Sequence, residues 1–523
     1  MANKSLFANI FGKLIPVTDA VNDEGAPAYA RTPKGMLAQF AATGCLHATF
    51  YATAETQLAE LLALAIAVEP LFVAKTAVYA RERGFMKDAP AVLLAALSLR
   101  DRALFARVFN RVVTDARMLR TFVQVMRSGA VGRKSLGTRP KRLVRAWLES
   151  RDGDAIVRAS VGADPSLADV LRMVHPKPAD ASRRALYGYV LGRPYDAALL
   201  PESAKQLEAF KSGARDVVPD VPFQLLTSLD LGPREWTAIA LRASWQTVRM
   251  NLSTFARHGV FDDEAVTASI ADKLRSRDEI ARARVFPYQL MSAWTATAAS
   301  DGSRGTIPRA IRDALADAIE VATANVPAVD GKVFVCPDTS GSMESPVTGE
   351  RRGATTSVRC VDVAALVAAA LLRKNPDAEV LPFAEAVKPV QLNPRDTITT
   401  NAAVLATLGG GGTNCSAPLA ELNRRNARGD LVVYVSDNES WADERHGRGT
   451  ATMVEWTAFK RRNPSARLVC IDLQPNPTVQ APDRDDVLNV GGFSDAVFEV
   501  VAAFRRGGLN ADHWVRTIDE VSV

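Results

Sequence analysis

Apolar and polar positions alternate in two different ways along this chain, and the pattern changes near residue 330. Before that point, apolar residues recur every three or four positions in stretches rich in Ala and Leu, which is the spacing of one helix face. Short breaks with Gly or Pro separate these stretches, and strand signals are nearly absent. The predicted helices cover residues 54–68, 90–110, 143–150, 203–212, 238–258 and 263–274. Consecutive helices without a strict repeat predict a stack of irregular helical repeats.

The second part of the chain alternates short apolar runs with longer stretches of helical spacing. The predicted strands are residues 333–337, 378–383, 431–436 and 466–473, and the predicted helices are residues 360–374, 453–462 and 495–505. Because strands and helices alternate, the pattern predicts a parallel, doubly wound sheet. We therefore expect a helical domain over residues 1–325 and an α/β domain over residues 331–523, joined by the segment NVPAVDG.

Three oxygen-bearing side chains directly follow the first predicted strand: Asp338, Ser340 and Ser342. Residues two positions apart can turn toward one side of the chain, so one carboxylate and two hydroxyls can meet at one point. Such hard donors suit Mg²⁺ or another divalent cation. Asp, Ser and Gly also populate ordinary turns, so this segment alone leaves a simple turn as an alternative.

Two later residues favour the metal interpretation. Thr413 follows a run of four glycines, and Asp437 comes directly after the predicted strand 431–436. In an open α/β sheet the carboxyl ends of the strands share one edge, and ligands bind there. We therefore expect Thr413 and Asp437 to join the three residues after the first strand in a single cation site.

Composition is that of an ordinary globular protein, with 47% hydrophobic and 23% charged residues. No apolar run approaches the roughly 20 residues needed to cross a bilayer, and the first residues lack the pattern of a secretory signal. The five cysteines are scattered without C-x-x-C spacing. These features predict a cytoplasmic protein in a reducing compartment, without a membrane partner.

Positive charge is concentrated in one window of the helical part. The net charge of the chain is +6, whereas residues 101–150 alone hold twelve Lys or Arg and three Asp or Glu. Clustered Arg and Lys neutralise phosphates and bind nucleic acid with strong salt dependence, and arginine also stacks on unpaired bases. A basic helix face can equally be a solvated surface or serve another partner, so both alternatives stay open at this point.

Specific segments resemble two known families. DTSGSM, GGTN and SDN match the metal-ion-dependent adhesion site (MIDAS) of von Willebrand factor A domains, and the five residues named above fall on its metal-binding positions. SGAVGRKSLGTRPKRLVRAW, DVLRMVHPKP and RVFPYQLMSAW, together with GGTNCSAPL, SDNESW and GGFSDAV, resemble the Ro family of RNA-binding proteins, especially its bacterial members. This resemblance implies a ring-shaped, HEAT-like helical (TROVE) domain closed by the Rossmann-like A domain, in a monomeric protein.

The same resemblance implies a non-enzymatic role in RNA quality control, processing or stress survival. Ro proteins bind Y-RNA-like small noncoding RNA on the outer surface of the ring and take single-stranded 3′ ends of misfolded RNAs into its central hole. In bacteria an exoribonuclease such as polynucleotide phosphorylase is an implied partner. The expected RNA-binding residues are Arg127, Arg133, Lys134, Arg139, Lys141, Arg142, Arg145, Arg158, Arg172, His175 and Lys177. His175 matches a family RNA contact, whereas a second basic position expected near Arg158 falls close to Gly162.

The alternative function is that of a metal-dependent scaffold for protein interaction. An ion in the adhesion-type site leaves a coordination position that an acidic group of a partner can fill. Catalysis by Cys415, which lies beside the glycine run, has no local Cys-His pairing to support it, so we expect no enzyme activity.

Overall fold

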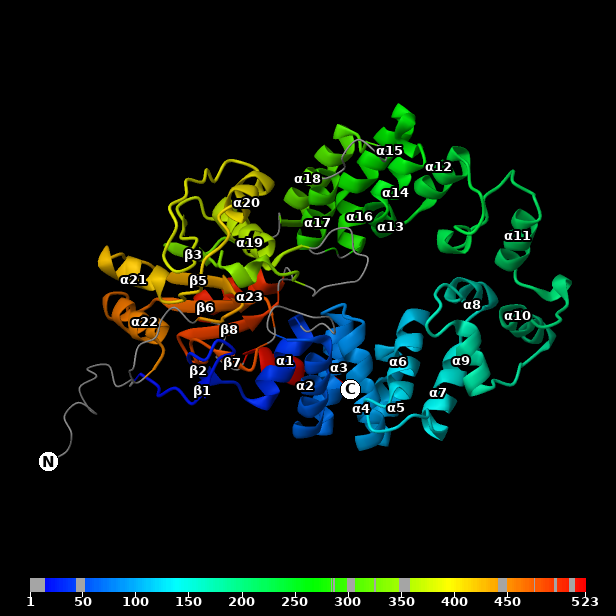
Figure 1. Cartoon of the computed structure of the whole chain (residues 1–523), viewed down its shortest axis with the longest axis horizontal. Helices are drawn as coiled ribbons and strands as arrows, with labels where there is room; N and C mark the ends of the chain where they lie inside the picture. Colours follow the sequence, from blue (N-terminus) through cyan, green and yellow to red (C-terminus); the bar gives the residue numbers. More distant parts are fainter. Residues whose placement is uncertain are drawn as a thin grey trace. The chain divides into compact units, whose positions relative to one another are not determined.

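The computed structural model describes residues 15–43, 52–283, 285, 287–298, 306–323, 326–347, 358–440, 449–474, 476–492, 496–507 and 513–523 (Figure 1). The described residues fall into two compact units. The α/β unit takes its residues from 1–57, 275–296 and 315–517, and the helical unit takes its residues from 58–274, 297–314 and 518–523.

A parallel sheet forms the centre of the α/β unit. Among the described residues it has five strands in the order β4-β3-β5-β6-β8. The strands are β3 (Val333–Pro337), β4 (Glu379–Val380), β5 (Leu431–Ser436), β6 (Arg467–Asp472) and β8 (Val487–Gly491). Every residue of β3, β5 and β8 is buried, as expected for a parallel sheet that is covered on both faces. The predicted α/β fold is therefore confirmed.

Helices pack on this sheet according to the alternation of its side chains. The bounds are α19 (Cys360–Lys374), α20 (Ile398–Ala406), α21 (Ala417–Arg424), α22 (Ala451–Arg462) and α23 (Ala496–Arg505). Phe334, Val432 and Leu468 share one core with the apolar residues of α21 and α22. Because side chains alternate along a strand, Val335 and Val433 face the opposite side, where α19 contacts β3 and β5. The sheet is therefore doubly wound (Figure 1).

A second, small sheet joins the beginning of the chain to the α/β unit. In the described part, β1 (Ala20–Val21), β2 (Pro27–Ala30) and β7 (Thr478–Val479) form three antiparallel strands, and Tyr29 pairs with Val479. The following helix, α1 (Pro33–Thr43), contacts β8. The sequence predicts a division near residues 325–331, and the contacts divide the chain differently. Strand pairing between distant segments leaves no local periodicity in the sequence. The pattern of apolar positions therefore does not indicate that the first residues belong to the α/β unit.

Helices build the other unit, as predicted. Those that lie wholly or mostly in it include α2 (Ala54–Ala67), α3 (Pro70–Glu82), α4 (Asp88–Arg100), α5 (Arg102–Val112), α6 (Ala116–Ser128), α7 (Thr138–Glu149), α8 (Gly153–Ala159), α9 (Leu167–Val174), α10 (Ala181–Leu191), α11 (Glu202–Lys211), α12 (Pro233–Arg242), α13 (Trp245–Met250), α14 (Leu252–Arg257) and α15 (Glu264–Arg275). Neighbouring helices pack through apolar faces, and the rings of Phe105, Phe109 and Phe122 form one cluster with centroids 5.4–5.9 Å apart.

Polar capping residues divide the longer predicted helices. The predicted helix 90–110 breaks at Asp101, whose carboxylate accepts hydrogen bonds from the backbone N–H groups of Ala103 and Leu104 and so starts α5. The predicted helix 238–258 breaks at Ser244, which caps α13. A side chain that satisfies the free N–H groups of a new helix stabilises the break. None of the helices in the described ranges is long and apolar enough to cross a membrane.

Candidate metal and nucleic-acid sites

The structure places the five predicted metal ligands at the carboxyl edge of the large sheet. Asp338 follows β3 and Asp437 follows β5, and these two strands pair in parallel. Ser340 and Ser342 lie at the start of η5 (Gly341–Glu344), and Thr413 lies in the loop before α21. All five side chains are buried.

Backbone hydrogen bonds hold the three contributing loops together. Gly341 N–H donates to Gly411 O, and Gly410 N–H donates to Thr339 O, both at 2.9 Å. Gly410 and Gly411 have φ values of 102° and 98°, a region that favours glycine, so the glycine run is needed for this approach. Ser440 Oγ, in the loop after β5, accepts from Cys415 N–H at 3.1 Å. The segment containing Thr413 is thereby tied to the other two loops.

Asp338 is held by two hydrogen bonds. Ser340 N–H donates to Asp338 Oδ1 at 2.8 Å, and Ser436 Oγ donates to Asp338 Oδ2 at 2.6 Å. The Ser340 and Ser342 hydroxyl oxygens lie 3.3 Å apart. Ser436 was not among the predicted site residues. The only sequence signal for it is its place directly before Asp437 at the end of an apolar strand.

Asp437 carries an unpaired buried oxygen. Its Oδ2 has no hydrogen-bond partner among the described residues, and its Oδ1 accepts a long bond of 3.4 Å from Glu439 N–H. The Ser342 hydroxyl also lowers the pKa of Asp437. Burial and the neighbouring charge of Asp338 raise the pKa of Asp437 to about 7, and burial also raises the pKa of Asp338. Two buried carboxyl groups that lie beside each other are costly to ionise without a cation.

The donor set fits a hard divalent cation. Two carboxylates and three hydroxyls supply only oxygen atoms, which Mg²⁺ prefers. No group of three or more His, Cys, Asp and Glu side chains that could hold a metal occurs in the described ranges. When bound, a divalent ion would neutralise both carboxylates and offer a coordination position to an external acidic group.

A third acid at the same edge has a partner from the beginning of the chain. Asp472, the last residue of β6, forms a buried ion pair with Arg31 and also accepts a hydrogen bond from Asn438. Burial lowers the pKa of Arg31 to about 10. Asn438 directly follows Asp437 and has a φ of 64°. Sequence reasoning missed Arg31 and Asp472, because nothing in the local pattern links two residues 441 positions apart.

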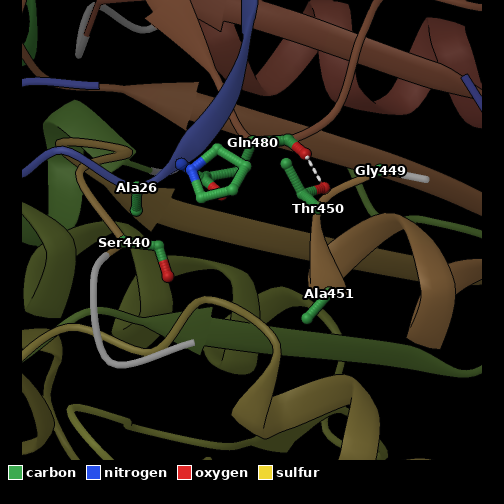
Figure 2. A pocket seen from close by; sticks show the side chains of 7 residues that line it. Ala26, Ser440, Gly449, Thr450, Ala451 and Gln480 are labelled. Carbon is green, nitrogen blue, oxygen red and sulfur yellow. Dashed lines mark hydrogen bonds between the residues drawn. The ribbon is translucent and has the colours of Figure 1, made fainter. Parts of the chain in front are cut away.

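A small pocket lies beside these loops, between the β1–β2 hairpin and the start of α22 (Figure 2). The space in and around it that no atom fills, open solvent included, is about 240 Å³, and its lining is Ala26, Pro27, Ser440, Gly449, Thr450, Ala451 and Gln480. Thr450 Oγ1 donates to Gln480 O at 2.5 Å. No acid, histidine or cysteine occurs among these lining residues. Cys415, the one thiol considered as a nucleophile, is buried, and burial raises its pKa well above the usual value. A buried neutral thiol is unreactive.

Several predicted RNA-binding residues meet at the carboxyl end of α9. Arg127, near the end of α6, contacts Met173 Sδ, and Arg145 of α7 donates to Val174 O. His175 follows as the C-cap residue with a φ of 49°, and it is exposed. Cations are favourable where helix carbonyls lack partners. Two arginines and an exposed imidazole therefore surround one helix end.

The loop between α6 and α7 and the start of α7 carry further cations. Gly129 and Gly137 have φ values of 89° and 74°, and side chains lie closely over both. A Cβ on Gly129 would lie 3.3 Å from Lys134 Cε, and a Cβ on Gly137 would lie 3.2 Å from Arg133 Nη1. Lys141 and Arg142 follow in the first two turns of α7, and Arg139 Nη1 donates to Arg102 O at 2.7 Å.

We call Arg127, Arg133, Lys134, Arg139, Lys141, Arg142, Arg145 and His175 the α9 cluster. No acidic side chain in the described ranges forms an ion pair with any of its members. Lys177, two residues after His175, is exposed and likewise has no acidic partner among the described residues. The positive charge of this region is therefore not neutralised within the described part of the chain.

Two other predicted RNA-binding residues have acidic partners. Arg158 pairs with Asp220 at 2.6 Å, and Arg172 pairs with Asp169 at 2.9 Å. Exposed pairs of this kind contribute only about 0–1 kcal/mol, so RNA phosphates could replace the carboxylates. A cation from another helix lies near Gly162, since a Cβ on Gly162 would lie 2.6 Å from Nη2 of Arg120 in α6.

Comparisons with known proteins agree with the resemblance to Ro proteins over most of the chain. Residues 332–505 match the family model described as the Ro60 vWA domain. The RNA-binding protein RO60 of Deinococcus radiodurans is 26% identical over 517 residues, which is 93% of this chain and 95% of that protein. The RNA-binding protein RO60 of Caenorhabditis elegans is 22% identical over 269 residues, 50% of this chain and 40% of that protein.

A solved structure shares the fold. The crystal structure of the Deinococcus radiodurans RO (RSR) protein superposes with a TM-score of 0.63 at 23% identity, covering 91% of this chain and all of that one. The names of the curated relatives describe RNA-binding proteins and no enzyme activity. The chain is therefore similar to Ro proteins over nearly its whole length, and its residues 332–505 match a von Willebrand factor A domain of the Ro60 type.

Proposed function

We propose that this protein is a non-enzymatic RNA-binding protein and that the α9 cluster contacts the RNA. The observation that carries the proposal is the convergence of Arg127, Arg145 and exposed His175 on one helix end, without acidic partners in the described ranges. The RNA-binding name of the full-length relative supports it.

Phosphate contacts explain how such a surface works. Arg and Lys neutralise phosphates and release counterions, which gives affinity without base specificity. Guanidinium planes and the imidazole can also stack on unpaired bases. A surface of this kind selects RNA by shape and by accessible single strands. We therefore propose, as the finer part of this function, Y-RNA-like small noncoding RNA and misfolded RNA with single-stranded 3′ ends as ligands, in RNA quality control.

The test is RNA binding as a function of salt. Arg133, Lys134, Arg139, Lys141 and Arg142 are replaced together by Ala, and affinity is measured by fluorescence anisotropy for a structured RNA with a single-stranded 3′ tail. We expect weaker binding and a flatter dependence of log affinity on log salt, with the slope smaller by about 0.7 for each phosphate that the variant no longer neutralises. The control replaces two exposed cations elsewhere, Lys205 of α11 and Arg257 of α14. A variant with unchanged affinity and slope would rule out this surface.

We also propose a divalent cation, most simply Mg²⁺, between Asp338, Ser340, Ser342, Thr413 and Asp437. The unpaired Oδ2 of Asp437 favours this second function, because a buried carboxylate oxygen without a partner is costly. The ion would let the A domain bind an acidic group of a protein partner. If the ion serves a protein partner, RNA binding by the α9 cluster does not depend on the metal. The two functions can then be tested separately.

A further inference from the structure

Cations also gather at the amino-terminal end of α6, around residues Val113 to Asp115, which link α5 to α6. Arg81 Nη2 donates to Thr114 Oγ1 at 2.6 Å and to Asp115 Oδ2 at 2.9 Å. Arg151 Nη2 donates to Thr114 O at 3.3 Å. The guanidinium of Arg151 lies 4.6 Å from the centroid of the Trp147 ring, which fixes its orientation. An arginine of α3 and one from the segment between α7 and α8 thus meet at one short loop.

Three more cations surround the same place. Lys87, at the start of α4, and Arg117, in the first turn of α6, are exposed and have no ion pair within the described residues. Arg120 lies one turn further along α6 and donates to Ala159 O at 2.9 Å. Two acids offset this charge: Asp115 caps α6 and pairs with Arg81, and Asp88 lies in the first turn of α4.

The cations repel one another. Partial burial of the Lys87 side chain, and after it the charge of Arg117, lowers the pKa of Lys87, although Asp115 and Asp88 act in the opposite direction. The same two causes lower the pKa of Arg120. Positive groups that destabilise each other's charged form favour an external anion between them, and the amino-terminal end of α6 adds the positive end of a helix dipole.

We propose that Arg81, Lys87, Arg117, Arg120 and Arg151, here called the α6 cluster, bind phosphate groups of the same RNA strand that contacts the α9 cluster. This inference rests on the proposed RNA-binding function. Helix α6 has 13 residues, so its two ends are about 20 Å apart at about 1.5 Å per residue. Phosphates lie about 3.4 Å apart along a stacked strand, so a segment of about six nucleotides spans the two clusters.

Length of the RNA is therefore the variable that reveals the second cluster. A single-stranded oligonucleotide of about three nucleotides can reach only one cluster, whereas one of about twelve can contact both. Lys87 and Arg117 are the residues to change, because Arg81, Arg120 and Arg151 also hydrogen-bond to the protein and their loss could disturb the fold.

The experiment compares the full-length chain with the double variant Lys87→Ala, Arg117→Ala on both oligonucleotides over a range of salt. For the long oligonucleotide we expect about tenfold weaker binding and a log–log salt slope smaller by about 1.4, which corresponds to two phosphate contacts at about 0.7 each. The short oligonucleotide should lose less affinity. The charge-conserving variant Lys87→Arg, Arg117→Lys should keep the slope, and the Lys205→Ala, Arg257→Ala variant serves as a control for net charge.

Two results separate this inference from the proposed function. If the five-residue variant of the α9 cluster loses RNA affinity while Lys87→Ala, Arg117→Ala retains both affinity and slope, the α6 cluster does not bind the strand. If neither variant changes RNA binding, the RNA-binding function of this surface is itself wrong.

Discussion

Arg31 and Asp472 form a buried ion pair next to the candidate metal site, although 441 positions separate them in the sequence. Asp472 also accepts a hydrogen bond from Asn438, the residue after the expected ligand Asp437. Asn22 Nδ2 donates to Ser440 O at 2.7 Å, and Asp23 N–H donates to Glu439 at 3.0 Å. The beginning of the chain therefore positions the loop that carries Asp437.

Replacing Arg31 by Ala should destabilise the α/β unit strongly. The change leaves the carboxylate of Asp472 buried without its partner, which costs about 3–5 kcal/mol for a buried pair. The thermal unfolding transition of the full chain measures this effect. The double variant Arg31→Ala, Asp472→Asn should recover part of the loss, because the buried charge is then absent. Equal stability of the single variant and the wild type would contradict a buried ion pair.

Asp338→Ala should abolish stabilisation by Mg²⁺ and leave RNA binding unchanged. The carboxylate is one of two in the expected donor set, and the α9 cluster lies in the other unit. Isothermal titration with MgCl₂ and the shift of the unfolding temperature with added Mg²⁺ measure metal binding. A folded variant that loses RNA affinity would instead place the ion in the RNA site. Ser436→Ala serves as a milder comparison, because it removes only the 2.6 Å hydrogen bond to Asp338.

Metal-free protein should lose stability as the pH rises through about 7. Asp437 has a folded-state pKa of about 7, raised from the ordinary 3.8, so the folded state binds its proton more tightly than the unfolded state. The resulting contribution to stability is complete below about pH 4 and disappears above pH 7. Mg²⁺ needs ionised carboxylates, so its affinity should increase from pH 6 to pH 8.

The measurement is thermal unfolding at pH 6, 7 and 8 with EDTA and with MgCl₂. The stabilisation by Mg²⁺ should be largest at pH 8. Asp437→Asn removes the titrating group and should flatten the pH dependence of the metal-free protein over this range. If the unfolding temperature of the wild type differs between EDTA and MgCl₂ by the same amount at all three pH values, Mg²⁺ binding does not depend on the ionisation of Asp437.

His175 offers a way to separate a structural role from an RNA contact. Its φ of 49° is left-handed, a conformation that glycine adopts without strain. His175→Gly should therefore raise stability by about 1 kcal/mol, since left-handed backbone costs other residues about 1–2 kcal/mol. If the imidazole contacts RNA, the same variant binds RNA more weakly despite being more stable. A parallel gain in stability and unchanged RNA affinity would make His175 purely structural.

Local pattern determined much of the secondary structure. The predicted strands 333–337 and 431–436 coincide with β3 and β5, because each is a short apolar run that ends at an acidic residue. These strand ends also led directly to Asp338 and Asp437, since parallel neighbours place their carboxyl ends at one edge. The glycine run before Thr413 was visible for a similar reason, because the left-handed backbone of Gly410 and Gly411 needs glycine.

Other features depend on contacts between distant segments, and only the tertiary structure decided them. Strands β1, β2 and β7 are too short to show a period, and Asn489 interrupts the apolar run of β8. The sequence by itself determined where helices and strands form and which oxygen-bearing residues end the strands, because both follow from local spacing. The Arg31–Asp472 pair, the position of Arg120 beside Gly162 and the assignment of the first strands to the α/β unit required the folded chain, because each depends on residues brought together from far apart in the sequence.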